Sequence, residues 1–300
     1  MLKVAFSEKY IYTLPDNHRF PIAKYILVKE QLIYEGTIEE NQIFDPGLVE
    51  EDLILQIHDE DYWNKLKQLK LSHKEARRIG LPITEISVKR ARNSVAGTVE
   101  STDNALEYGV GVNLAGGTHH AYRDRGEGFC ALNDIAIASH YLLSRKLASK
   151  ILVVDLDVHQ GNGTAKIFEG DDRVFTFSMH GEHNYPLRKE VSDLDIALPL
   201  GTSDETYLQT LSYYLTKLFE SVKPDFVFYQ SGVDVLDADR LGKLALSKKG
   251  CKRRDEIVLG MCHQYQVPVV VTMGGGYTER LVDLVDAHCN TTRVATELYA

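Results

Sequence analysis

The sequence predicts an α/β fold in which one central, mostly parallel β-sheet is covered by helices on both faces. Two observations lead to this prediction. Short apolar runs that scarcely alternate with polar residues recur through the second half of the chain, as is typical of parallel strands buried on both faces. Longer segments carry apolar residues at helical intervals and would cover the sheet.

The elements follow from these patterns in order along the chain. The opening MLKVAFSEKY has only a short apolar run, which indicates a first strand and not a signal peptide. Further strands are expected at Ile151 to Val154, Val174 to Phe177, Phe226 to Tyr229 and Val267 to Thr272. Helices are expected at Thr84 to Glu107, Asp134 to Leu147, Glu205 to Val222 and Asp255 to Tyr265. Segment 70–83 is polar and contains Gly80 and Pro82, which favours a surface loop.

Composition restricts the class of protein. With 300 residues, 44% of them hydrophobic and 26% charged, the chain is expected to fold, and without linker or repeat we expect a single domain over residues 1–300. The net charge of −9 argues against nucleic acid as a partner, and no run approaches a membrane span. Basic residues from Lys248 to Arg254 are expected on the solvated face of a helix start. Four scattered cysteines indicate reduced thiols and a cytoplasmic protein, or a nuclear one if the source is eukaryotic.

Polar side chains follow the predicted strands, at the edge where open α/β sheets bind ligands. Asp157 and His159 are two residues apart, so in an extended segment their side chains point to one side, about 6 to 7 Å apart. Both can reach one metal ion, and Asp234 would complete a set that leaves a position open for water. Zinc fits this donor set best, with ferrous iron as the alternative.

Three further features would surround that metal. Asp155 points the same way as Asp157 and needs a cation or a histidine partner, because an unpaired buried carboxylate is strongly disfavoured. The tandem His119-His120 offers that partner and suits proton transfer near neutral pH. The turn GGGY ends in Tyr277, a phenol that can donate a hydrogen bond to a developing oxyanion.

Four ordered blocks resemble the signature of the zinc-dependent histone deacetylase family: GTHHAYRDRGEGFCALND, ILVVDLDVHQGNGTA, QSGVDVLDADRLG and MGGGYT. The opening of the chain, with HRFPIAKY, is also similar to that of the family, and HQGNG resembles its class IV branch and related prokaryotic deacetylases. The resemblance implies the arginase-deacetylase fold. It also implies a zinc-dependent amidohydrolase that removes acetyl or longer fatty acyl groups from lysine in peptides or proteins by metal-activated water.

The resemblance carries roles to individual residues. Zinc would be held by Asp157, His159 and Asp234, the catalytic pair would be His119 and His120, and Tyr277 would polarise the amide carbonyl. Gly128 and Phe129 resemble the wall of an acyl-lysine tunnel, and hydroxamate-type zinc-chelating inhibitors are expected to bind. A structural potassium or sodium ion would lie near Asp155, Asp157, His159, Ser178 and Met179. A second monovalent cation would involve Phe168, Asp171, Val174 and Tyr207.

One position departs from the family pattern. Most members place an aspartate beside each catalytic histidine, and Asp155 matches the first, but Asn162 stands at the second. A neutral amide orients an imidazole without stabilising its cation, so His120 is expected to be less readily protonated and better suited as a base. Gln160 replaces the more usual histidine and is expected to act at most indirectly.

Three alternatives remain at the level of sequence. An arginase-like ureohydrolase would need a second metal, yet Gly161 and Leu236 stand where its extra ligands belong. An acetylpolyamine amidohydrolase would share the site, although no long insertion that narrows the entrance is evident. A catalytically silent binding module would be expected to lack one of the site residues, and none is missing.

Overall fold

The computed structural model describes residues 2–16 and 18–299 and contains a sheet of eight parallel strands. The strands are β1 (Lys3–Ala5), β2 (Ile43–Phe44), β3 (Val110–Asn113), β4 (Ile151–Asp155), β5 (Val174–Gly181), β6 (Leu194–Leu198), β7 (Phe226–Gln230) and β8 (Val269–Thr272). Their order across the sheet is β2-β1-β3-β8-β7-β4-β5-β6. The predicted α/β class is therefore confirmed. Met1, the first residue of the predicted opening strand, lies outside the described residues.

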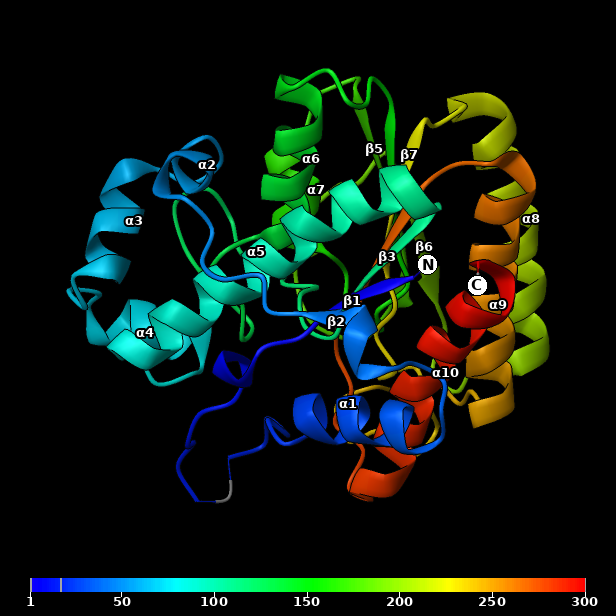
Figure 1. Cartoon of the computed structure of the whole chain (residues 1–300), viewed down its shortest axis with the longest axis horizontal. Coiled ribbons are helices and arrows are strands. Elements are labelled where there is room, and N and C mark those ends of the chain that lie inside the picture. Colours follow the sequence, from blue (N-terminus) through cyan, green and yellow to red (C-terminus); the bar gives the residue numbers. More distant parts are fainter. Residues whose placement is uncertain (1, 17, 300) are drawn as a thin grey trace.

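Helices cover both faces of the sheet (Figure 1). On one face α5 (Glu85–Tyr108), α6 (Asp134–Ser144) and α7 (Asn162–Phe168) pack side by side. The other face is covered by α1 (Lys24–Tyr34), α10 (Leu281–Tyr299), α9 (Lys248–Tyr265) and α8 (Asp204–Val222), which contact one another in that order. The short helices α2 (Glu51–Leu55), α3 (Glu60–Lys67) and α4 (His73–Ile79) extend beyond the edge of the sheet, and the 3-10 turns Glu8–Tyr10 and Glu40–Gln42 complete the elements.

Strands β3, β4, β7 and β8 are neighbours at the centre of the sheet, and every one of their residues is buried. This explains their unalternated apolar sequences, since both faces are covered by helices. Because all strands are parallel, the loops that leave their carboxyl ends meet at one edge. The loops after these four strands carry the predicted zinc ligands, both histidines and Tyr277. Asp155 is the last residue of β4, and Asn162 begins α7.

One predicted loop is in fact helical. Segment 70–83 contains α4, whose start is fixed by a capping box between Ser72 and Glu75. Gly80 ends the helix in the left-handed conformation, with φ of 76°. The polar residues and the glycine, on which the prediction of a loop is based, instead form the caps at the two ends of a short helix. Among the described helices, none has a segment long and apolar enough to cross a membrane.

The prediction that the basic residues at the start of α9 face solvent is wrong for Arg254, because its side chain is fully buried. Its guanidinium donates to the carbonyls of Gly232 at 2.5 Å and Ser231 at 3.1 Å, and to the Asp255 carboxylate at 2.8 Å. A weaker contact of 3.4 Å reaches the carbonyl of Leu156. Arg254 thus ties together the ends of β4 and β7, next to Asp157 and Asp234.

We expect Arg254→Met to lower the free energy of unfolding by about 3 to 5 kcal/mol, because it leaves the Asp255 carboxylate buried without its cation. Arg253→Met is the matched control, since Arg253 is exposed and, among the described residues, forms a salt bridge with Glu256 alone. Its loss of stability is expected to stay below about 1 kcal/mol. Urea denaturation of both variants measures the difference, and equal stabilities would contradict the role of Arg254.

Candidate active site

The structure brings Asp157, His159 and Asp234 together in a buried group at the carboxyl edge of the sheet, with one donor atom from each within 4.8 Å of the others. His159 Nδ1 lies 3.0 Å from Asp157 Oδ1 and 3.1 Å from Asp234 Oδ2. Asp157 and His159 follow the end of β4 in a bend and not in the extended segment predicted. Their side chains nevertheless converge.

The two carboxylates are held so that one oxygen of each faces His159. The remaining oxygens accept backbone hydrogen bonds, Asp157 Oδ2 from Gly275 at 2.8 Å and Asp234 Oδ1 from Val158 at 2.9 Å. Two carboxylate oxygens and one imidazole nitrogen fit a zinc ion with an open position, the arrangement of catalytic zinc sites. In the part of the chain that the structure describes, this is the single group of three or more such residues.

The two buried carboxylates of this group favour the binding of a cation, which can be a metal ion or a proton on His159. Burial, followed by the neighbouring charge of Asp157, raises the pKa of Asp234 to about 7. Burial opposes a charged imidazole, but hydrogen bonds to both carboxylates outweigh it and raise the pKa of His159 to about 10. A metal ion that binds here therefore competes with a proton on His159.

The tandem histidines lie beside this group in the loop that follows β3. His119 Nδ1 is 2.6 Å from Asp155 Oδ2, and its Nε2 is 3.9 Å from Asp157 Oδ1. His120 Nδ1 is 2.6 Å from Asn162 Oδ1. Both histidines and both partners are buried, so each imidazole is oriented by a residue at the end of β4 or in the segment that follows it.

The two histidines have opposite electrostatic surroundings. Burial disfavours the His119 cation, but the charges of Asp155 and Asp157 outweigh it and raise the pKa of His119 to about 9. Burial lowers the pKa of His120 well below its usual range, and the cationic forms of His119 and His159 lower it further. The hydrogen bond that Asn162 Oδ1 accepts from His120 is too weak to compensate, so His120 is neutral at physiological pH.

An outer cavity of about 300 Å³ leads to this site, and Gly128, Phe129, His120, His159 and Tyr277 line it. The Tyr277 and Phe129 rings are 6.0 Å apart, and Tyr277 is 6.4 Å from the His159 ring. The predicted tunnel residues and the predicted phenol thus lie together at the wall of this cavity. Burial and the charges of Asp234 and Asp157 raise the pKa of Tyr277 well above its usual range, so the phenol keeps its proton.

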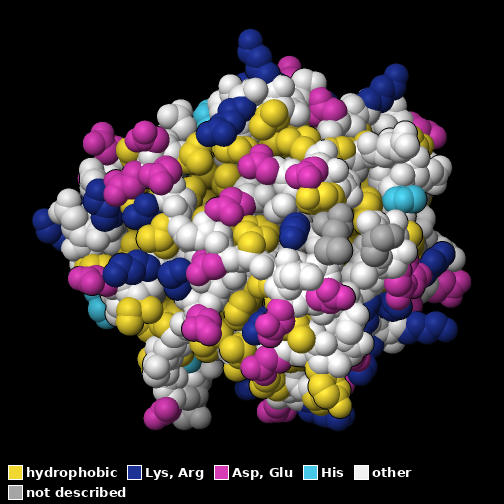
Figure 2. Space-filling model, viewed as in Figure 1, with side chains coloured by type: hydrophobic (Ala, Val, Ile, Leu, Met, Phe, Trp, Pro, Cys, Tyr) yellow, Lys and Arg dark blue, Asp and Glu magenta, His cyan; other side chains and the backbone are white. Residues whose placement is uncertain are grey.

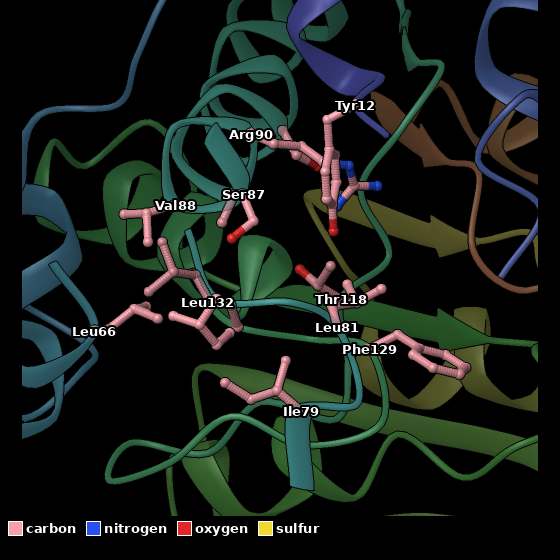
Figure 3. A pocket seen from close by; sticks show the side chains of 14 residues that line it. Tyr12, Leu66, Ile79, Leu81, Ser87, Val88, Arg90, Thr118, Phe129 and Leu132 are labelled. Atoms are coloured by element: carbon pink, nitrogen blue, oxygen red, sulfur yellow. The ribbon is translucent and has the colours of Figure 1, made fainter. Parts of the chain in front are cut away.

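Two smaller spaces adjoin this cavity and share lining residues with it. The first, about 40 Å³, borders the predicted zinc ligands Asp157 and His159, and the second, about 20 Å³, is mostly apolar (Figure 3). Arg90, Thr118 and Phe129 line both, with Arg90 at one end beside Tyr12 in Figure 3. Sequence reasoning missed Arg90, because an arginine within a long amphipathic helix gives no sign that it is buried.

Lys24 is a second missed residue. Its side chain is fully buried, and its Nζ donates a 2.9 Å hydrogen bond to the carbonyl of Gly274 in the turn that carries Tyr277. Burial lowers the pKa of Lys24 to about 8. The HRFPIAKY segment resembles the opening of the family, but nothing in its polar pattern indicates that the lysine reaches the active site.

The residues predicted for monovalent cations differ in their placement. Ser178 lies opposite Asp155 in the β4-β5 ladder, near Asp157, and a cation there stays a prediction. The second set is not brought together. Val174 begins β5 at the amino edge of the sheet, whereas Tyr207 lies in the first turn of α8 at the carboxyl edge, near Arg254. Phe168 and Asp171 stay with Val174 at the amino edge, and Asp171 pairs with Arg173.

The fold and the site together define an α/β protein with a buried group of three side chains that could hold one metal ion. The model of the histone deacetylase domain matches residues 18–292. The chain therefore belongs to the histone deacetylase domain family.

Individual relatives agree with this assignment. An uncharacterized protein of Picosynechococcus sp. is 45% identical over 99% of both chains. Histone deacetylase 2 of Arabidopsis thaliana is 32% identical, over 87% of this chain and 70% of its own length. Among solved structures, a histone deacetylase homolog complexed with SAHA superposes with a TM-score of 0.86 at 26% identity, over 99% of this chain and 84% of the other.

Gly275 allows the carboxylates to approach the backbone. A Cβ at this position would lie 2.7 Å from Asp157 Oδ2 and even closer to Asp234 Oδ2, which neither oxygen can tolerate. We expect Gly275→Ala to displace both carboxylates and to weaken zinc binding by about 10-fold or more, a loss of about 1.4 kcal/mol. Competition with a chromogenic chelator measures the zinc affinity.

Gly260→Ala is the control for this substitution. Gly260 lies within α9, and a Cβ added there would have no neighbour within 4 Å. Alanine is therefore expected to stabilise the helix by about 0.5 to 1 kcal/mol and to leave zinc affinity unchanged. Unchanged zinc affinity in Gly275→Ala would contradict the geometry of the site.

Proposed function

We propose that the protein is a zinc-dependent lysine deacylase, which hydrolyses the amide between an acyl group and the ε-nitrogen of lysine in peptides or proteins. The observation that carries this proposal is the convergence of Asp157, His159 and Asp234 beside two oriented histidines at the inner end of a cavity. Zinc, when bound, supplies Lewis-acid polarisation of the carbonyl and lowers the pKa of water.

The side chains of the site would transfer the proton, stabilise the developing charge and hold the substrate. His120 is neutral, and a proton on its Nδ1, facing Asn162 Oδ1, leaves Nε2 free to accept a proton as general base. His119 is cationic, held by Asp155, and its positive charge stabilises the negative charge that develops during hydrolysis. Tyr277 keeps its proton and donates to the carbonyl oxygen, while Phe129 and Gly128 enclose the lysine stem.

The inner spaces favour a short acyl group. Volumes of about 40 and 20 Å³ correspond to a few water molecules at most, since about 10 to 15 Å³ of such volume holds one water. An acetyl group fits there, whereas a fatty acyl chain needs the apolar wall formed by residues such as Leu66, Ile79 and Leu132 to move. Among the acyl groups considered, we therefore favour acetyl.

The alternatives have less support. The described residues contain one metal-binding group, whereas an arginase-like ureohydrolase needs ligands for two ions. Acetylpolyamines are cationic, and the outer cavity is lined by Arg19, Arg77, Arg78 and Lys243 with no carboxylate among its described lining residues. Repulsion at this mouth disfavours a polyamine. A catalytically silent module would not need both oriented histidines.

The family branch, the cellular location, the monovalent cation, the inhibitors and the domain boundaries are further parts of the proposal, each supported by one kind of observation. Asn162 and Gln160 support the class IV branch, and four free, buried cysteines support a reducing, cytoplasmic location. The family resemblance supports a structural potassium or sodium ion beside Asp155 and Ser178, and binding of hydroxamate-type inhibitors. We also propose that residues 1–300 form one catalytic domain.

Peptides that differ only in acyl length, tested alongside acetylspermidine, examine the function directly. We expect zinc-dependent release of acetate from acetyl-lysine, slower release of longer chains and little turnover of acetylspermidine. Tyr277→Phe is expected to lower kcat by about 10²- to 10³-fold with zinc retained, because one oxyanion donor is lost. No hydrolysis of any substrate by zinc-loaded protein would contradict the proposal, and full activity of Tyr277→Phe would contradict the role of the phenol.

Asn162→Asp tests the state of His120. A carboxylate would stabilise the His120 cation and raise its pKa, so the base would lose its proton only at higher pH. The acidic limb of the pH profile of kcat/KM is therefore expected to move to higher pH, by about one unit. An acidic limb that does not move would exclude His120 as the titrating base.

A further inference from the structure

The outer cavity has a cationic mouth formed by Arg19, Arg77, Arg78 and Lys243, which come from three separate segments of the chain. All four side chains are exposed, and within the described residues none of them forms a salt bridge. This differs from the rest of the protein, whose net charge is −9 and which shows intermingled acidic and basic side chains over the face in Figure 2.

We propose that this mouth selects acyl-lysine segments that carry aspartate or glutamate close to the acylated residue. The inference rests on the proposed function. Acylation removes the charge of the lysine itself, so the flanking residues determine the charge that a substrate presents to the mouth. Arginine suits this role, because its guanidinium can bind a carboxylate through two parallel hydrogen bonds.

The test uses three peptides with the same acetyl-lysine, flanked on both sides by aspartate, asparagine or lysine. At low ionic strength we expect kcat/KM and affinity to decrease in that order, by about 10-fold between the extremes, since exposed ion pairs contribute modestly. At about 1 M salt the difference is expected to disappear, because the Debye length falls to about 3 Å. Binding is measured by fluorescence anisotropy alongside turnover.

The double substitution R77E/R78E is expected to reverse the order of the three peptides. K217E/K249E changes the net charge equally on exposed helix surfaces away from the cavity, and is expected to preserve the order. Equal binding of the three peptides at low salt, or an unchanged order in R77E/R78E, would overturn the inference. Hydrolysis of all three peptides at one rate would refute this selectivity alone, whereas hydrolysis of none would refute the proposed function.

A separate observation concerns Glu127, which lies in the same loop as His119 and His120 and contacts Asn162, the partner of His120. Its side chain is 13% exposed, and Oε1 accepts a 3.1 Å hydrogen bond from Asn162 Nδ2 and another from the Tyr185 hydroxyl. Its second oxygen faces Arg125 Nε at 3.5 Å. Asn162 Nδ2 also donates to the Tyr122 hydroxyl at 2.9 Å.

The direction of these hydrogen bonds is fixed by groups that can only accept. Tyr122 donates its proton to the Glu190 carboxylate at 3.1 Å, so its oxygen accepts from Asn162. Glu127 also accepts from the same amide nitrogen. Both acceptors therefore hold the Asn162 amide with Nδ2 toward Glu127 and the Tyr122 hydroxyl and with Oδ1 toward His120.

We infer that Glu127 is a positioning residue that determines the tautomer of His120. Because Asn162 Oδ1 only accepts, His120 must carry its proton on Nδ1, which leaves Nε2 bare toward the cavity. An aspartate at position 162 would impose this tautomer by itself, but an asparagine can turn over and present its amino group instead. Glu127, together with the Tyr122 hydroxyl, opposes that rotation, and this deepens the function proposed above.

Glu127→Gln weakens the constraint, since a glutamine amide can donate as well as accept and only the Tyr122 hydroxyl is left as a fixed acceptor for Asn162 Nδ2. Nitrogen-15 NMR of histidine-labelled protein is expected to show His120 protonated on Nδ1 in the wild type and a mixture of tautomers in the variant. We expect kcat to fall about 10- to 100-fold with KM unchanged, within the range that a general base contributes. Asp124→Asn, which changes an exposed carboxylate of the same loop, is the matched control and is expected to keep the wild-type tautomer.

The same Glu127→Gln substitution made in the Asn162→Asp variant distinguishes a positioning role of Glu127 from a general effect on stability. There the new carboxylate fixes the tautomer, so adding Glu127→Gln is expected to cause no further loss of kcat. A single tautomer in Glu127→Gln, or an equal loss of kcat in both backgrounds, would overturn the inference. The NMR result is independent of turnover, so it decides this point even if the proposed activity is not found.

Discussion

Two buried carboxylates, Asp157 and Asp234, impose the main constraint on this structure, because both point at His159 from the carboxyl edge of a parallel sheet. Such a pair is costly to bury without a cation. One oxygen of each carboxylate accepts a hydrogen bond from a backbone N–H group, and the other oxygen faces His159 Nδ1. Arg254 supports the arrangement from behind by tying the two strand ends together.

The contrast between the tandem histidines follows from the same constraint. His119 lies against Asp155 and close to Asp157, and it takes the positive charge. His120 faces a neutral amide and two potential cations, and it stays neutral. One sequence motif therefore supplies two residues of different charge, because they meet different partners at the end of β4 and in the segment that follows it.

Much of the site could be predicted from sequence because its residues follow apolar strands that are easy to recognise. The strands β4, β7 and β8 are predicted close to their observed bounds, whereas β5 continues past the predicted end at Phe177 to Gly181. The group Asp157, His159 and Asp234 follows β4 and β7. The strand β3 was missed because it has four residues, one of them glycine, directly after a long helix. Contacts made by Lys24, Arg90 and Arg254 depend on burial across distant segments, and local polarity suggested exposure instead.

The presence of a single divalent ion between these three side chains is the central claim. The most direct measurement is anomalous diffraction at the zinc absorption edge from crystals of the zinc-loaded protein. The account predicts one strong peak, within bonding distance of Asp157, His159 and Asp234 and open toward the cavity. A peak elsewhere, a pair of adjacent metal ions, or no peak at these residues despite zinc in the crystal would contradict it.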